Sequence, residues 1–145
     1  MKKILWAIPA LAVIVRVYLF IFVQKSLWLD EAALALNVLD KGYLELFQPL
    51  QYAQSAPPLF LLCTKFLTEI FAAGERVFRL IPLLCSIGTV FGFYFLLCDV
   101  FKEKKWCIIF GLIIFSSGFP LLYNAIEFKP YEMDVLFTIL AALIW

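Results

Sequence analysis

The sequence predicts an all-helical integral membrane protein, a multi-span bundle with two juxtamembrane helices in its first outer loop. The first observation is composition: 65% of the residues are hydrophobic and 16% are charged, whereas soluble domains average roughly half and a quarter. The second is that the apolar residues form runs long enough for a helix to cross the ~30 Å hydrocarbon core of a bilayer. The net charge of +1 gives no reason to expect a nucleic-acid partner. The sequence has no histidine, so it lacks the commonest metal ligand and the usual general base.

The first apolar run, residues 4–23, follows two lysines and predicts a membrane-spanning helix. A secretory signal peptide is the alternative, but its apolar core should be shorter and should end at a small-x-small cleavage site. This run ends in VQKS at 23–26. We therefore expect an uncleaved helix whose N-terminus the lysines keep in the cytoplasm.

The placement of charge limits how many of the later runs can cross the membrane. Further apolar runs cover residues 57–73, 80–101, 106–122 and 133–145. If all of them crossed, the KEKK loop at 102–105 would face outside, against the positive-inside rule, and the acids at 127–134 would lie across the membrane from Asp30. The weakest candidate to cross opens with two prolines, and one face of its helix is polar: Thr64, Lys65, Thr68 and Glu69. We expect this run to lie at the membrane interface instead.

The resulting layout makes residues 1–145 the N-terminal part of a single transmembrane domain. The predicted spans are about 4–23, 79–101, 106–122 and 133–145, and the outer loops are 24–78 and 123–132. The last run is still apolar at Trp145. We therefore expect a fragment of a larger multi-span protein in a bacterial plasma membrane, inactive by itself.

Two smaller patterns bear on how the helices pack. Gly88 and Gly92 form a GxxxG, which suits either close helix contact or ordinary lipid-facing glycines. The four cysteines have no CxxC spacing and predict small buried side chains rather than a metal site or disulfide framework.

Asp30 and Glu31 are adjacent carboxylates just beyond the first predicted span. One interpretation makes Asp30 the N-cap of a helix over 31–41, with Gly42 as its C′ residue. The other makes the pair part of a reactive site at the membrane surface. That second interpretation requires another polar cluster on the same face.

A second cluster is present in YNAIEFKPYEMD, residues 123–134. Glu127, Lys129 and Tyr131 alternate, and in an extended segment alternate side chains share one side. Asp134 suits either a helix N-cap or a site. The alternative for all of these charges is ordinary solvation in a loop.

Two arginines in or next to predicted spans also need a structural or functional explanation. Arg79, before the second span, suits either an interfacial arginine whose charge reaches the headgroups or a phosphate ligand. Arg16 lies within the first predicted span, where a charge costs at least ~2.5 kcal/mol on insertion scales. It should face the bundle interior and pair with an acid that the sequence does not identify.

Four segments follow one another along the chain: LWLDEAALALNVLDKG, QSAPPLFLL, GERVFRLIPLL and YNAIEFKPYEMD. Their order resembles the N-terminal part of the GT-C membrane glycosyltransferases, in particular the protein-mannosyltransferase-like group that includes the lipid A aminoarabinose transferases. Together they extend over essentially the whole chain, but over only the first part of such an enzyme. One departure is Ala56, where some members carry a lysine before the two prolines.

The resemblance implies a site and a reaction. Asp30 would be the catalytic base with Glu31 beside it. Residues that match the family's other motifs would bind substrate or lipid phosphate: Arg79, Glu127, Lys129 and Tyr131. Asp134, at the start of the last predicted span, is a further candidate for the same role. The donor would be a polyprenyl- or dolichyl-phosphate-linked sugar, and the acceptor a glycan, lipid or protein hydroxyl. The implied transfer inverts the anomeric carbon. Mg²⁺ or Mn²⁺ dependence stays open, because the family includes both kinds of member and carboxylates without histidine suit these ions.

Two other functions remain compatible with the sequence, a multi-span transporter or flippase and a non-catalytic membrane subunit. Transporters usually place their polar residues near mid-bilayer, on broken helices. Here the acids are predicted at one surface, which favours the enzyme.

Overall fold

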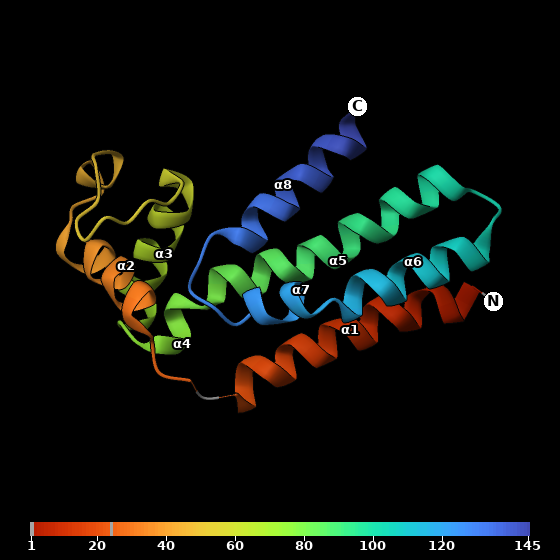
Figure 1. Cartoon of the computed structure of the whole chain (residues 1–145), viewed down its shortest axis with the longest axis horizontal. Helices are drawn as coiled ribbons and strands as arrows, with labels where there is room; N and C mark the ends of the chain where they lie inside the picture. The colour runs from red at the N-terminus through yellow and green to blue at the C-terminus, as the bar shows by residue number, and fades with distance from the viewer. Residues whose placement is uncertain (1, 24) are drawn as a thin grey trace.

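The structure is a computed structural model that describes residues 2–23 and 25–145. The described residues form eight α-helices and one short 3-10 helix, and no strand occurs among them. The all-helical prediction is therefore confirmed. The helices fall into a long bundle and a smaller lobe at one of its ends (Figure 1).

The bundle contains α1 (Lys2–Phe22), α5 (Leu80–Phe101), α6 (Lys105–Ser117) and α8 (Tyr131–Ile144). In Figure 1 these helices run roughly alongside one another, and α5 contacts each of the other three. Two segments of the described chain, Leu5–Phe22 and Glu75–Phe101, are long and apolar enough to cross a membrane.

Close contact between α5 and α8 depends on the two glycines of the GxxxG pattern. A Cβ added to Gly88 would lie 3.2 Å from Leu136 Cδ1, and one added to Gly92 would lie 3.0 Å from Ile139 Cγ2. Both glycines therefore face α8, and of the two predicted alternatives the close helix contact is the one found.

The predicted third helix, 106–122, is broken into α6 and α7 (Phe119–Asn124) at Gly118. Pro120 stands in the first turn of α7, where its missing N–H costs no hydrogen bond; within a continuous helix it would break the backbone ladder. The prediction of one uninterrupted helix here was wrong because it gave this proline no weight.

The lobe consists of α2 (Leu29–Asp40), the 3-10 helix η1 (Glu45–Phe47), α3 (Pro58–Phe71) and α4 (Glu75–Phe78). Its core also takes in Phe128 from the second loop, whose ring lies 5.4 Å from that of Phe60 and 5.1 Å from that of Phe78. At 14 residues, α3 is about 21 Å long and falls short of a bilayer's hydrocarbon core.

The faces of α3 differ from those of a soluble surface helix. Much of its polar stripe points into the lobe: Thr64 and Thr68 are buried, and the Lys65 amine donates to the Val38 carbonyl at 3.1 Å, whereas Glu69 is exposed. Its outer face carries large exposed apolar side chains: Leu59, Phe66, Ile70 and Phe71. Such a face suits an apolar surrounding.

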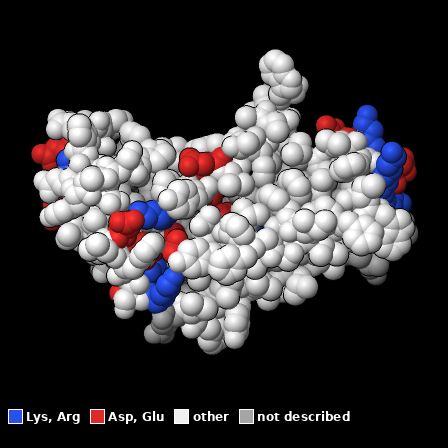
Figure 2. All heavy atoms as spheres, in the orientation of Figure 1, with Lys and Arg blue, Asp and Glu red and all other residues white. Residues whose placement is uncertain are grey.

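The charged side chains on the surface are also confined to particular regions. Figure 2 shows charged side chains over the lobe and the adjoining end of the bundle, and again at the bundle's far end, with uncharged surface between. The far group belongs to the basic turn between α5 and α6, where residues 102–104 are exposed.

The four cysteines are free thiols. Cys63, Cys85 and Cys98 are partly buried, but Cys107 is exposed, so the prediction of a buried side chain was wrong at that position.

Candidate functional site

The start of α2 differs from the predicted cap. The helix begins at Leu29 with Trp28 as its N-cap residue, so Asp30 lies inside the first turn and is not the cap. The carboxylate of Glu31 accepts the Trp28 backbone N–H at 3.3 Å, which satisfies a donor that the helix itself leaves unpaired. The N-cap position expected for Asp30 therefore belongs to Trp28, and the carboxylate that contacts the helix start is that of Glu31.

Glu31 is fully buried and joins three segments that are far apart in sequence. Its Oε2 lies 2.9 Å from Nη2 of Arg79, and its Oε1 accepts the backbone N–H of Phe128. Arg79 also donates to the carbonyls of Lys25 and Ser26. Glu31 and Arg79 are thus committed to each other and to the backbone around them.

Asp30 has a different environment although it is the next residue. Its side chain is 55% exposed, and its Oδ2 lies 3.8 Å from Nζ of Lys129. The same amine donates to Oε1 of Gln54 at 3.4 Å. The first and second polar clusters of the sequence therefore meet at Asp30 and Lys129, and the carboxylate stays accessible.

Glu127 is buried and faces Lys25, with 3.8 Å between its Oε1 and Nζ. The Lys25 amine also donates to the phenol oxygen of Tyr123 at 2.9 Å. That hydrogen bond raises the pKa of Lys25; burial opposes the rise, and the charges of Tyr123, Glu127 and Glu31 add to it. Lys25 is therefore held as a cation at the edge of the site.

The predicted extended segment through Glu127, Lys129 and Tyr131 is not found, because residues 125–130 form turns. Tyr131 is instead the first residue of α8 and is 49% exposed. Asp134 is not an N-cap either, since Pro130 holds that position; it lines a groove bounded by α5, α6 and α8. Tyr131 and Asp134 are therefore not brought to Asp30 by any described contact.

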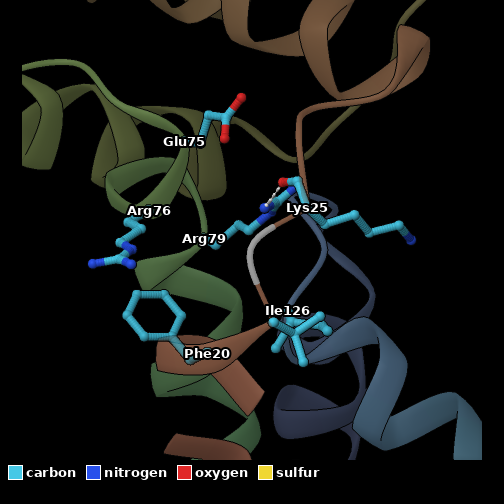
Figure 3. Close-up of a pocket in the computed structure, with 7 residues that line it drawn as sticks. Phe20, Lys25, Glu75, Arg76, Arg79 and Ile126 are labelled. Carbon is cyan, nitrogen blue, oxygen red and sulfur yellow. Dashed lines mark hydrogen bonds between the residues drawn. The ribbon is translucent and has the colours of Figure 1, made fainter. Parts of the chain in front are cut away.

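A pocket of about 70 Å³ lies next to Arg79. Its other lining residues are the charged Lys25, Glu75 and Arg76 and the apolar Phe20, Val23 and Ile126. In Figure 3 the Lys25 amine and the Arg76 guanidinium point away from Arg79. The three cations do not converge, and the pocket is smaller than the roughly 300 Å³ at which ligand pockets begin. The geometry does not make this a phosphate site.

Arg16 is fully buried in the bundle, as expected for a charge in a span. Its Nε donates to Ser86 of α5 at 2.8 Å, and Glu132 of α8 is the acid whose charge acts on it. Nη2 of Arg16 and both carboxylate oxygens of Glu132 are buried and have no hydrogen-bond partner among the residues that the structure describes. Sequence reasoning missed Ser86 and treated Glu132 as a loop residue, although its position at the start of an apolar run could have placed it in the helix.

The carboxylates of the site are placed beside cations. Within residues 2–23 and 25–145, no three Asp, Glu or Cys side chains gather as a ligand set would. Glu31, Asp30 and Glu127 each face a cation, which would compete with a metal ion for the same oxygens.

The structure brings together five of the seven predicted site residues: Asp30, Glu31, Arg79, Glu127 and Lys129. Comparisons of the chain with protein-family models, with curated proteins and with solved structures find no match.

Proposed function

We propose that this chain is the N-terminal part of a membrane glycosyltransferase of the GT-C type. It transfers a sugar from a lipid-phosphate-linked donor to a hydroxyl acceptor at the outer face of a bacterial plasma membrane. The observation that carries the proposal is the accessible carboxylate of Asp30, held 3.8 Å from Lys129 at the end of an apolar bundle. The ordered sequence resemblance supports the same reaction class.

In this proposal the two adjacent acids have different tasks. Asp30 accepts the proton of the acceptor hydroxyl as its oxygen attacks the anomeric carbon; the bond from that carbon to the donor phosphate breaks, and the phosphate keeps the electron pair. A positioned base contributes typically ~10²–10⁴-fold to the rate. Glu31 cannot share this task, because Arg79 and two backbone N–H groups occupy it. It holds the second loop against the first.

Lys129 is the cation best placed to assist the leaving group. Its amine is next to Asp30, whereas the guanidinium of Arg79 faces Glu31. A preorganised cation at the point where negative charge develops stabilises a transition state more than it would in water. Of the two cations that the resemblance assigned to the phosphate, we therefore keep Lys129 for this role.

The proposed enzyme is a multi-span membrane protein whose lobe rests on the outer surface. Two helices long and apolar enough to cross, the uncharged band along the bundle in Figure 2 and the apolar outer face of α3 support this arrangement. The lysines of the turn between α5 and α6 then face the cytoplasm, in agreement with the positive-inside rule.

The test is Asp30→Asn in the full-length gene product, expressed in cells that lack the native gene. Asp40→Asn is the matched control, because Asp40 is an exposed acid at the other end of the same helix. With membrane levels equalised by immunoblot, glycolipids and glycans are compared by mass spectrometry. We expect Asp30→Asn to lower product formation at least ~100-fold and Asp40→Asn to leave it unchanged. Near wild-type product with Asp30→Asn would remove the proposed base.

A further inference from the structure

A cleft of about 380 Å³ opens in the lobe between η1 and the start of α3. Its volume lies in the roughly 300–1,000 Å³ range of ligand pockets. The cleft is lined by Phe47, Gln48 and Pro49 on one side and by Gln54, Ser55 and Pro58 on the other.

Hydrogen bonds to the backbone fix the loop that forms the cleft. The side-chain amide of Asn37 both accepts the Gln51 N–H at 2.7 Å and donates to the Gln51 carbonyl at 3.2 Å. The Lys41 amine donates to the Pro49 carbonyl at 3.0 Å. Asn37 is itself buried in α2, so the cleft is attached to the lobe's core.

The chemistry of the lining restricts what the cleft can hold. Among the described residues that line it, none is charged, so it offers no counter-ion to a phosphate or a metal ion. An entirely apolar ligand would leave the amide of Gln48 and the hydroxyl of Ser55 without partners, which is unfavourable. A neutral, hydroxyl-rich ring fits a cleft that has no charge but has polar groups to pair. Its hydroxyls can pair with the amide of Gln48 and the hydroxyl of Ser55, and its C–H face can pack on Phe47, which is 62% exposed.

The cleft is connected to the candidate base through one residue. Gln54, in its wall, accepts a hydrogen bond from the Lys129 amine at 3.4 Å, and that amine lies 3.8 Å from Asp30. The wall of the cleft and the Lys129–Asp30 pair are therefore linked through the side chain of Gln54.

We propose that this cleft is a sugar-binding subsite. It rests on the proposed function for its use in catalysis, but binding itself does not depend on transfer. The ring has two sources, the sugar carried by the lipid-phosphate donor and the terminal sugar of a glycan acceptor.

Binding is measured by saturation-transfer NMR on the purified full-length protein in lipid nanodiscs. The probes are methyl glycosides of glucose, galactose, mannose and N-acetylglucosamine. The test variant is Phe47→Leu combined with Gln48→Leu. The control is Phe71→Leu, because Phe71 is also 62% exposed but lies on the outer face of α3. Thermal unfolding of each variant shows that the lobe is folded.

We expect saturation transfer to at least one glycoside in the wild type, a loss of about fivefold or more in the cleft variant and no loss in the control. Competition then separates the sources: a polyprenyl-phosphate hexose displaces the glycoside if the cleft holds the donor sugar and leaves it bound if the cleft holds the acceptor. Absence of transfer to every glycoside, or an equal signal from a folded cleft variant, would overturn the subsite. Asp30→Asn keeps sugar binding, so a failure of the proposed function is seen separately in product formation.

Discussion

Glu31 and Arg79 face each other inside the lobe, with 2.9 Å between carboxylate and guanidinium and with side chains only 1% and 7% exposed. Removing one partner of a buried ion pair typically costs about 3–5 kcal/mol, because it leaves the other charge unpaired. We expect Glu31→Ala and Arg79→Met each to lower the melting temperature of the purified protein in detergent. Glu103→Ala, in the exposed turn after α5, is the control. Unchanged melting of Glu31→Ala would contradict the importance of the pair.

The Arg16 and Glu132 charges should compensate each other in the bundle. Arg16→Met leaves Glu132 without its cation, and Glu132→Gln leaves Arg16 without its acid, so each single variant should be less stable than the wild type. The double variant should be more stable than the sum of the two single effects predicts. A double-mutant cycle of melting temperatures measures this coupling. Simple additivity would show that the two charges do not interact.

Gly92 should tolerate no larger side chain while α8 stays in place. Gly92→Leu forces atoms into the space occupied by Ile139, and overpacking of this kind typically costs about 1–3 kcal/mol. Gly74→Leu is the control, since a Cβ there meets nothing within 4 Å. We expect a lower melting temperature for Gly92→Leu alone, partly restored by Ile139→Ala. Equal melting of the two leucine variants would refute the close contact.

The hydrogen bond to Tyr123 should slow the acetylation of the Lys25 amine. The hydrogen bond raises the pKa of Lys25, so its contribution to stability is full below the ordinary lysine value of about 10.4 and is lost as the pH rises through the higher value of the folded state. At pH 9 the amine should therefore be acetylated faster in Tyr123→Phe than in the wild type. Peptide mass spectrometry gives the rates, with the exposed Lys102 as internal reference. An unchanged ratio would mean that Tyr123 does not hold this cation.

Membrane topology can be tested by single cysteines at positions 30, 69, 104 and 129, in a protein whose native cysteines are replaced. We expect an impermeant maleimide added outside intact cells to label 30 and 69 rapidly and 129 more slowly, because Lys129 is only 13% exposed. Position 104 should react only after permeabilisation. Labelling of 30 and 129 from opposite sides would end the proposal of a shared site.

The positions of the helices could be predicted because they depend on neighbouring residues in the sequence. The contacts between residues far apart in the sequence could not be predicted. Apolar runs and the two prolines that open α3 locate the helices through the immediate sequence. The pairing of Glu31 with Arg79 joins residues 48 positions apart, and no periodicity encodes it. Glu31 rather than Asp30 contacts the start of α2 because of where that helix begins. A shift of one or two residues at a helix end is below the resolution of such patterns.

The conformation of residues 125–130 could not be predicted from the sequence for a different reason. The alternation of Glu127, Lys129 and Tyr131 suggested an extended loop segment. Phe128 instead packs in the lobe's core against Phe60 and Phe78, and its backbone N–H donates to Glu31. Tertiary burial of one aromatic ring decided the local conformation. Lys129 faces Asp30 as a consequence of that burial rather than of its own spacing.

The three partners of Glu31 also leave the ribosome at different times. Arg79 follows Glu31 by 48 residues and the Phe128 amide follows it by 97. At ordinary synthesis rates the second interval lasts roughly 5–20 seconds. In the later part of that interval, after Arg79 has been made, the new chain has the charge pair but lacks the amide that closes the lobe. The lobe is therefore completed only after the hairpin of α5 and α6 has been made.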